Sequence, residues 1–147
     1  MTHVRQQLRE RIATNVTGLT TTGTNVFQSR VHDLATAELP CLLVFSNSES
    51  SERDSFLSSD GITRSVEVVI EGYARATSNL DDTLDTISEE VETAVAADPT
   101  CNSLAKDTVL NGTEIELTGE GDSPLGVVRL TWLVGYRTDA NTPGTAI

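Results

Sequence analysis

Basic side chains are scarce in this sequence of 147 residues. Ten Lys and Arg stand against 22 Asp and Glu, which gives a net charge of −12, and Lys106 is the single lysine. A surface of this sign repels phosphate, so we exclude a protein that reads a DNA sequence by direct contact. A channel through which DNA passes without sequence-specific binding stays open, because a repulsive wall does not hold phosphates.

Aromatic residues and cysteines are also few. With one Trp, two Tyr and three Phe, the core must be built mainly from Val, Leu and Ile. Cys41 lies in an apolar run, which favours a buried free thiol, and a disulfide with Cys101 is the alternative. No run approaches membrane-spanning length, and the polar N-terminus is not typical of a signal peptide.

Motifs that carry catalysis, cofactors or metals are lacking as well. The sequence has no phosphate-binding glycine loop followed by Lys, and no nucleophile elbow to support His32 in a catalytic triad. Cys41 and Cys101 lack the spacing of a zinc site, and Asp81, Asp82 and Asp85 lack that of a calcium loop. We therefore expect no enzyme, no cofactor and no metal.

What is present is a strand followed by a long helix, over residues 64–98. Alternation places Val66, Val68 and Ile70 on one face of the strand. After Ser78 or Asn79 at the N-cap position, one apolar stripe follows at helical spacing, through Leu80, Leu84, Ile87, Val91 and Val95. One element thus predicts both a half-buried strand and the helix that covers it.

The remaining chain supplies another helix and further strands. Val4, Leu8, Ile12 and Val16 predict an N-terminal amphipathic helix, with Thr2 as a possible N-cap. Strands are predicted at 26–31, 41–45, 107–117 and 126–137, the second of them apolar on both faces. In the last strand, one face carries Val128, Leu130, Trp132, Val134 and Tyr136.

This order of elements predicts an α+β fold. Strands joined without helices favour antiparallel pairing, so we expect a single mixed, mostly antiparallel sheet of about five strands with two main helices on one face. Residues 1–137 would form one domain, and residues 138–147 a flexible C-terminal tail.

The second face of this sheet mixes acidic, basic, aliphatic and aromatic groups, which is typical of a protein–protein interface. The candidate subunit interface comprises Glu67, Val69, Glu71, Tyr73, Arg75, Arg129, Leu133 and Arg137. The alternative is an ordinary exposed face whose charges form ion pairs within the chain.

A serine-rich polar connection at 46–61 is predicted between two strands. Because apolar residues interrupt it, it is a candidate assembly loop, with Glu49, Glu52, Arg53, Phe56 and Leu57 as its contact residues. The alternative is a simple mobile hairpin loop.

Several stretches together resemble a known family. They are the Leu-Pro-Cys-Leu-Leu-Val strand start at 39–44, the strand at 64–72, the helix after Leu80 that ends in Ala-Asp-Pro, and the closing aromatic strand at 126–137. In this order, after an N-terminal helix, they resemble the tail terminator (tail-completion) proteins of long-tailed phages and related archaeal viruses, with the lambda-type minor tail protein fold.

The resemblance implies a structural role and no residue-level site. Such subunits close into a hexameric ring on the tail tube, stop its growth and meet the head-proximal connector protein, while DNA passes through the ring. The implied location is the head-proximal end of the virion tail, after assembly in the host cytoplasm, without membrane contact. Alternatives are a head–tail connector or stopper of the same virion, and a small ligand-binding α+β domain or enzyme.

Overall fold

The computed structural model describes residues 2–28, 39–54, 61–76, 78–118 and 124–147. Its elements in chain order are α1 (Val4–Asn15), β1 (Val26–Phe27), β2 (Cys41–Arg53), β3 (Gly61–Arg75), α2 (Leu80–Ala96), β4 (Asp107–Thr118), β5 (Leu125–Asp139) and β6 (Thr142–Ala146).

The strands form a single mixed sheet in the order β1-β2-β3-β5-β4, and β6 pairs with β5 off this path. The β1–β2 pair is parallel, and the other pairs are antiparallel. The predicted α+β class is confirmed, with six strands where about five were expected.

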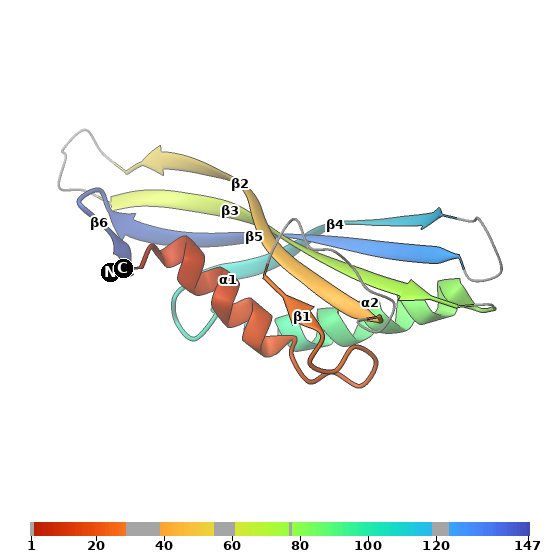
Figure 1. Cartoon of the computed structure of the whole chain (residues 1–147). Coiled ribbons are helices and arrows are strands. Elements are labelled where there is room, and N and C mark those ends of the chain that lie inside the picture. Colours follow the sequence, from red (N-terminus) through yellow and green to blue (C-terminus); the bar gives the residue numbers. More distant parts are fainter. Residues whose placement is uncertain (1, 29–38, 55–60, 77, 119–123) are drawn as a thin grey trace.

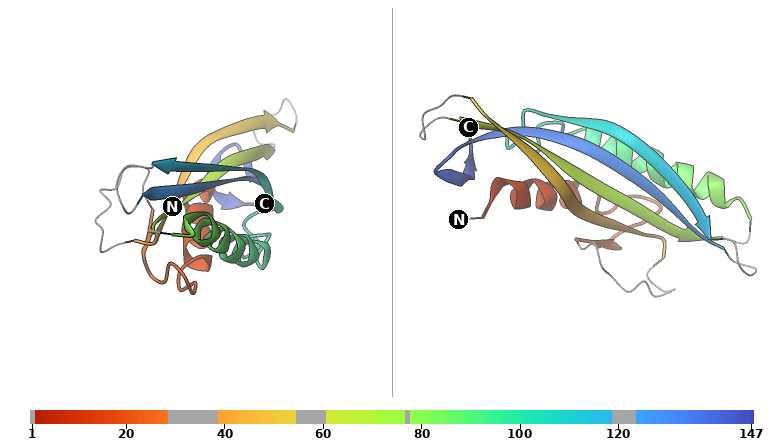
Figure 2. Two further views of the ribbon diagram at one scale, coloured as in Figure 1. Left: turned by 90° about the vertical axis from the view of Figure 1, so that its right-hand side faces the viewer. Right: turned by 90° about the horizontal axis from the view of Figure 1, so that it is seen from above.

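Both helices lie on the same side of the sheet, one after the other along its length (Figures 1 and 2). Helix α2 packs beneath β3 and β5, while α1 packs beneath β2 and reaches β6. The start of α1 therefore lies beside the last strand, and Gln7 Nε2 donates to the Gly144 carbonyl at 3.0 Å.

The core fills the layer between the helices and the sheet. The predicted apolar faces of β3 and β5 are all buried there, as are the apolar stripes of α1 and α2. The sheet approaches α2 closely at Gly72, where a Cβ would lie 2.7 Å from Ile87 Cγ2. The alternation and helix periodicity predicted for this layer are thus confirmed.

The N-caps of the helices differ in detail from the predicted ones. Helix α1 is capped by His3 instead of Thr2, because the His3 Nδ1 accepts from the Arg5 backbone N–H at 3.0 Å. For α2 the cap is Asn79, one of the two predicted residues, in a left-handed conformation (φ 57°) without a side-chain capping bond.

Strand β2 is much longer than predicted. The apolar run from Cys41 to Phe45 is buried on both faces, as expected, but the strand continues to Arg53 through the serine-rich segment assigned to a loop. Within the described residues, Ser46–Arg53 pairs only with β3, so this part is a solvent-exposed edge and needs no apolar alternation. Strand β1 has only two of the residues predicted at 26–31, and positions 29–31 lie outside the described residues.

The C-terminal segment also differs from the expected flexible tail. Strand β5 continues past residue 137 to Asp139, and 142–146 fold back as β6, with Thr138 opposite Ala146. Pro143 and Gly144 suggested a loop, but β6 is an edge strand paired on one side, where proline is tolerated.

Candidate functional site

The sheet face opposite the helices carries all eight residues of the candidate subunit interface. The register pairs Glu67 with Leu133, Glu71 with Arg129, and Arg137 with Thr63. Because antiparallel partners project to the same side, the interface residues of β3 and β5 form one continuous surface, which we call the outer face. In the described part of the chain, neither helix covers it (Figure 2).

Arg129 is the electrostatic centre of the outer face. Its Nε donates to Glu71 Oε2 at 2.7 Å and its NH1 to Glu114 Oε2 at 3.0 Å, while Glu116 lies 3.9 Å away. These carboxylates, the Glu71 hydrogen bond first, raise the pKa of Arg129 above its usual value. One guanidinium on β5 thus contacts three carboxylates from β3 and β4, the strands on either side of it.

The other charged groups of this face also have partners within the chain. Glu71 is only 6% exposed and accepts a second bond from the Tyr73 hydroxyl at 3.3 Å. Burial, followed by the Glu71 charge, raises the pKa of Tyr73. Glu67 accepts from Asn47 and Ser48, at 3.2 and 3.4 Å. The alternative of internal ion pairs therefore holds for Arg129 and Glu71.

Between these charges the outer face has a shallow hollow of about 510 Å³. Its two apolar lining residues, Phe45 and Val69, are largely buried, and the remaining lining residues are polar or charged. The hollow is lined by Phe45, Asn47, Glu67, Val69, Glu71, Glu114, Arg129 and Thr131. Nearby, Leu133 on the central strand β5 is 37% exposed.

Arg137, at the far end of the same face, binds Asp54. Its Nε donates to Asp54 Oδ2 at 2.9 Å, and the Thr63 hydroxyl donates to Asp54 Oδ1 at 2.7 Å. These hydrogen bonds, that of Thr63 first, lower the pKa of Asp54. The contact joins the end of β2 to β5 on the solvent-exposed side.

The candidate assembly loop requires a correction. Glu49, Glu52 and Arg53 lie on strand β2 and not in a loop, and Phe56 and Leu57 lie outside the described residues. Glu49 projects to the helix side, opposite Val66, and its side chain is only 9% exposed. It is therefore part of the subunit's own packing.

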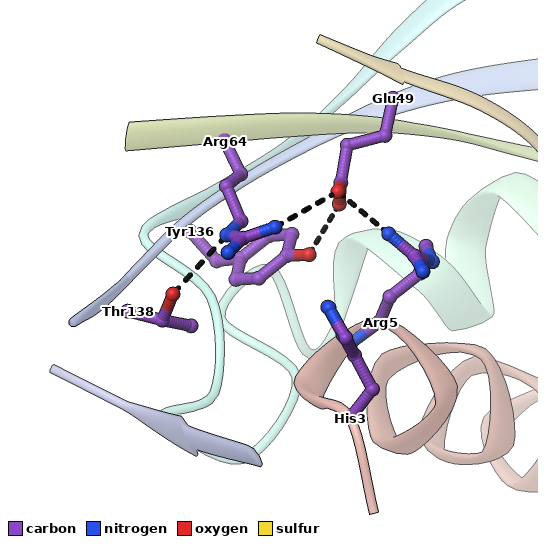
Figure 3. A network of polar contacts seen from close by, with 6 residues as sticks. All are labelled: His3, Arg5, Glu49, Arg64, Tyr136 and Thr138. Carbon is purple, nitrogen blue, oxygen red and sulfur yellow. Dashed lines mark hydrogen bonds and ion pairs between the residues drawn. The ribbon is translucent and has the colours of Figure 1, made fainter. Parts of the chain in front are cut away.

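Glu49 is the centre of a polar network that sequence reasoning missed (Figure 3). Its Oε2 lies 2.6 Å from Arg5 NH1 and 3.3 Å from Arg64 NH1, and its Oε1 accepts from the Tyr136 hydroxyl. Arg64 also donates to Thr138 Oγ1 at 3.1 Å. The network joins α1 to β2, β3 and β5; no local sequence signal marks it, because its members are far apart in the chain.

The pKa values of two side chains in this network, Tyr136 and His3, are shifted from their usual values. Burial, followed by the hydrogen bond to Glu49, raises the pKa of Tyr136. Burial, followed by the charges of Arg5 and Arg64, lowers the pKa of His3. Both shifts favour the neutral form of the side chain.

Among the described residues, no group of three or more His, Cys, Asp and Glu is placed to hold a metal ion. Cys41 and Cys101 are both buried free thiols, and burial raises the pKa of Cys101. No described helix is long and apolar enough to cross a membrane.

Comparison with known proteins gives a distant likeness among solved structures. Neither the protein-family models nor the curated proteins contain a match. Among solved structures, a chain from the virion of a native gene transfer agent particle is similar over 92% of both chains, with 15% sequence identity and a TM-score of 0.43. At this identity and TM-score the likeness carries no argument about function.

Proposed function

We propose that this protein is a virion structural subunit that closes into a ring, hexameric as in the family it resembles, on the end of a tail tube. In this role it stops tube growth and provides the joint to the head-proximal connector, with DNA passing through the ring. The proposal rests on the sequence resemblance, and the outer face is the structural observation that supports it.

The outer face supports a contact between subunits because it combines apolar area with charges that are already paired. Leu133 offers apolar area to a neighbour, and Arg129 and Glu71 are already paired with each other, so covering them would leave neither charge unpaired. Buried charges without partners are costly, whereas paired ones can be covered at a much smaller cost.

The pairing of charges within the chain decides which residue can test the contact. The structure pairs Arg129 with Glu71 and Glu114 of its own chain, so an Arg129 substitution would damage the subunit itself. Leu133 is the better probe of the contact, because it is exposed and makes no polar contact.

Negative-stain electron microscopy and light scattering of the purified protein test the proposal. We expect rings with a mass several times the 15.8 kDa of one subunit, either in solution or on the ends of purified tail tubes. Leu133→Glu should abolish them by placing an unpaired charge in the contact, whereas Thr86→Glu adds the same charge on the exposed side of α2 and should leave them intact.

Two results would count against the proposal. A monomer that neither forms rings nor caps tube ends removes the ring-forming function. If rings still form in Leu133→Glu, the ring-forming function stands, but the contact between subunits lies on a surface other than the outer face.

A further inference from the structure

Strand β4 is an edge strand whose exposure the proposed ring contact does not explain. It has twelve residues and pairs only with β5 among the described residues, so its other backbone edge is open. Ile115 and Leu117 are 50% and 51% exposed. Long, apolar edge strands are rarely left open, because they offer their backbone groups to any further strand.

The two sides of β4 differ in chemistry. Ile115 is paired with Val128 and Leu117 with Gly126, so both project to the helix side and extend the core layer sideways. Glu114 and Glu116 project to the outer face. An added strand would therefore meet aliphatic groups on one side and carboxylates on the other.

Negative charge surrounds this edge. Among the described residues, Arg129 alone forms ion pairs with Glu114 and Glu116. Arg129 lies closer to Glu71, at 2.7 Å, than to Glu114 at 3.0 Å or Glu116 at 3.9 Å. On the helix side, a hollow of about 390 Å³ beside Leu117 is lined also by Asn79, Leu80, Asp81, Asp82 and Pro124. Carboxylates thus flank the open edge on both sides of the sheet.

A second copy of this chain fits the edge poorly. A twofold pairing of β4 with β4 that covers Ile115 and Leu117 would place Glu114 and Glu116 of both copies next to one another, and like charges at such positions are destabilising. The open part of β2 would set Ser46, Glu49 and Ser51 against the aliphatic side, since these residues share the helix face of the sheet.

We propose that the β4 edge is a docking site for an extended segment of another protein, in which basic residues alternate with aliphatic ones. Strand addition would satisfy the open backbone groups, as in other cases where a peptide extends a sheet. The basic residues would face Glu114 and Glu116, and the aliphatic residues would cover Ile115 and Leu117. This inference does not depend on ring formation.

The probe is a capped peptide of about nine alternating lysine and valine residues, long enough for a typical strand. Its affinity is measured by fluorescence anisotropy at about 0.15 M salt, where long-range attraction is screened. Hydrogen exchange locates the site. We expect slower exchange within 107–118, and weaker binding by a block peptide that has the same residues with all lysines first, because only alternation matches the two sides of β4.

Matched variants separate the edge from overall charge. Glu114→Gln with Glu116→Gln should weaken binding about fivefold, the effect of losing two exposed ion pairs. Asp85→Asn with Glu89→Gln removes the same charge from the exposed side of α2 and should leave the affinity unchanged.

Three results would overturn the proposal. The first is equal binding of the alternating and block peptides, and the second is an equal loss of affinity in both pairs of variants. The third is exchange within 107–118 that slows with protein concentration but not with peptide, because a second copy would then cover the edge.

Discussion

Glu49→Ala should be among the most destabilising polar substitutions in this chain. The change removes the carboxylate that Arg5, Arg64 and the Tyr136 hydroxyl share. Arg64 is only 12% exposed, so its charge would lose its ion-pair partner in a poorly hydrated place, whereas Arg5 at 39% exposure would be largely resolvated. A lost charge-assisted bond contributes about 2 kcal/mol and an unsatisfied, mostly buried group about 1–3 kcal/mol.

The sum is about 3–5 kcal/mol, and we expect a loss in the free energy of unfolding at its lower end, about 3 kcal/mol, because Arg5 is exposed. For a chain of this length, that loss lowers the melting temperature by roughly 6–12 °C. Urea denaturation followed by circular dichroism measures the free energy directly.

Glu52→Ala is the matched control, since Glu52 is an exposed acidic residue of the same strand. It should change stability by no more than about 0.5 kcal/mol. If Glu49→Ala costs no more than this control, the network contributes nothing measurable and our account of how α1 is held is wrong.

Two further predictions concern the hydrophobic core and the loss of stability at low pH. Trp132 and Leu84 are buried, so Trp132→Ala should cost about 3–5 kcal/mol and Leu84→Ala about 2–5 kcal/mol in chemical denaturation; losses under about 1 kcal/mol at both would refute the assignment of the buried face. Hydrogen bonds from the Asn102 backbone, Arg11 and Asn15 lower the pKa of Asp98 below its usual value of 3.8. The Asp98 carboxylate therefore stabilises the folded state fully above pH 3.8, and this stabilisation is lost as the pH falls through the lower pKa of the folded state. Asp98→Asn should therefore flatten the fall of stability below about pH 4, and a melting-temperature profile identical to that of the unchanged protein would contradict this.

The sequence predicts those parts of the fold in which burial leaves a periodic pattern. Val66, Val68 and Ile70 alternate because one side of β3 meets the helices, and Leu84, Ile87 and Val91 recur because one side of α2 meets the sheet. Burial on a regular element is a local property, so a single segment is enough to reveal it. The outer face follows from the same alternation by elimination.

The parts that could not be predicted depend on partners distant in the chain. Residues Ser46–Arg53 have the composition of a loop, and only their pairing with β3 makes them a strand. Likewise, Glu49 and Arg5 are 44 positions apart, and Arg129 and Glu71 are 58 positions apart. Without the register of the strands, a sequence shows which charges share a face but not which of them are neighbours.

The distribution of charge connects these features to the proposed ring. On the outer face Arg129 is already paired with carboxylates of its own subunit, so contact there would depend on apolar area more than on attraction between Arg129 and a neighbouring subunit. By contrast, Asp81, Asp82, Asp85 and Glu89 are exposed on α2, on the other side of the sheet. If subunits meet through the outer face, the negative charge on α2 remains on a surface that the contact does not bury. Such a surface suits a passage for DNA, because carboxylates repel the phosphates that a basic wall would hold.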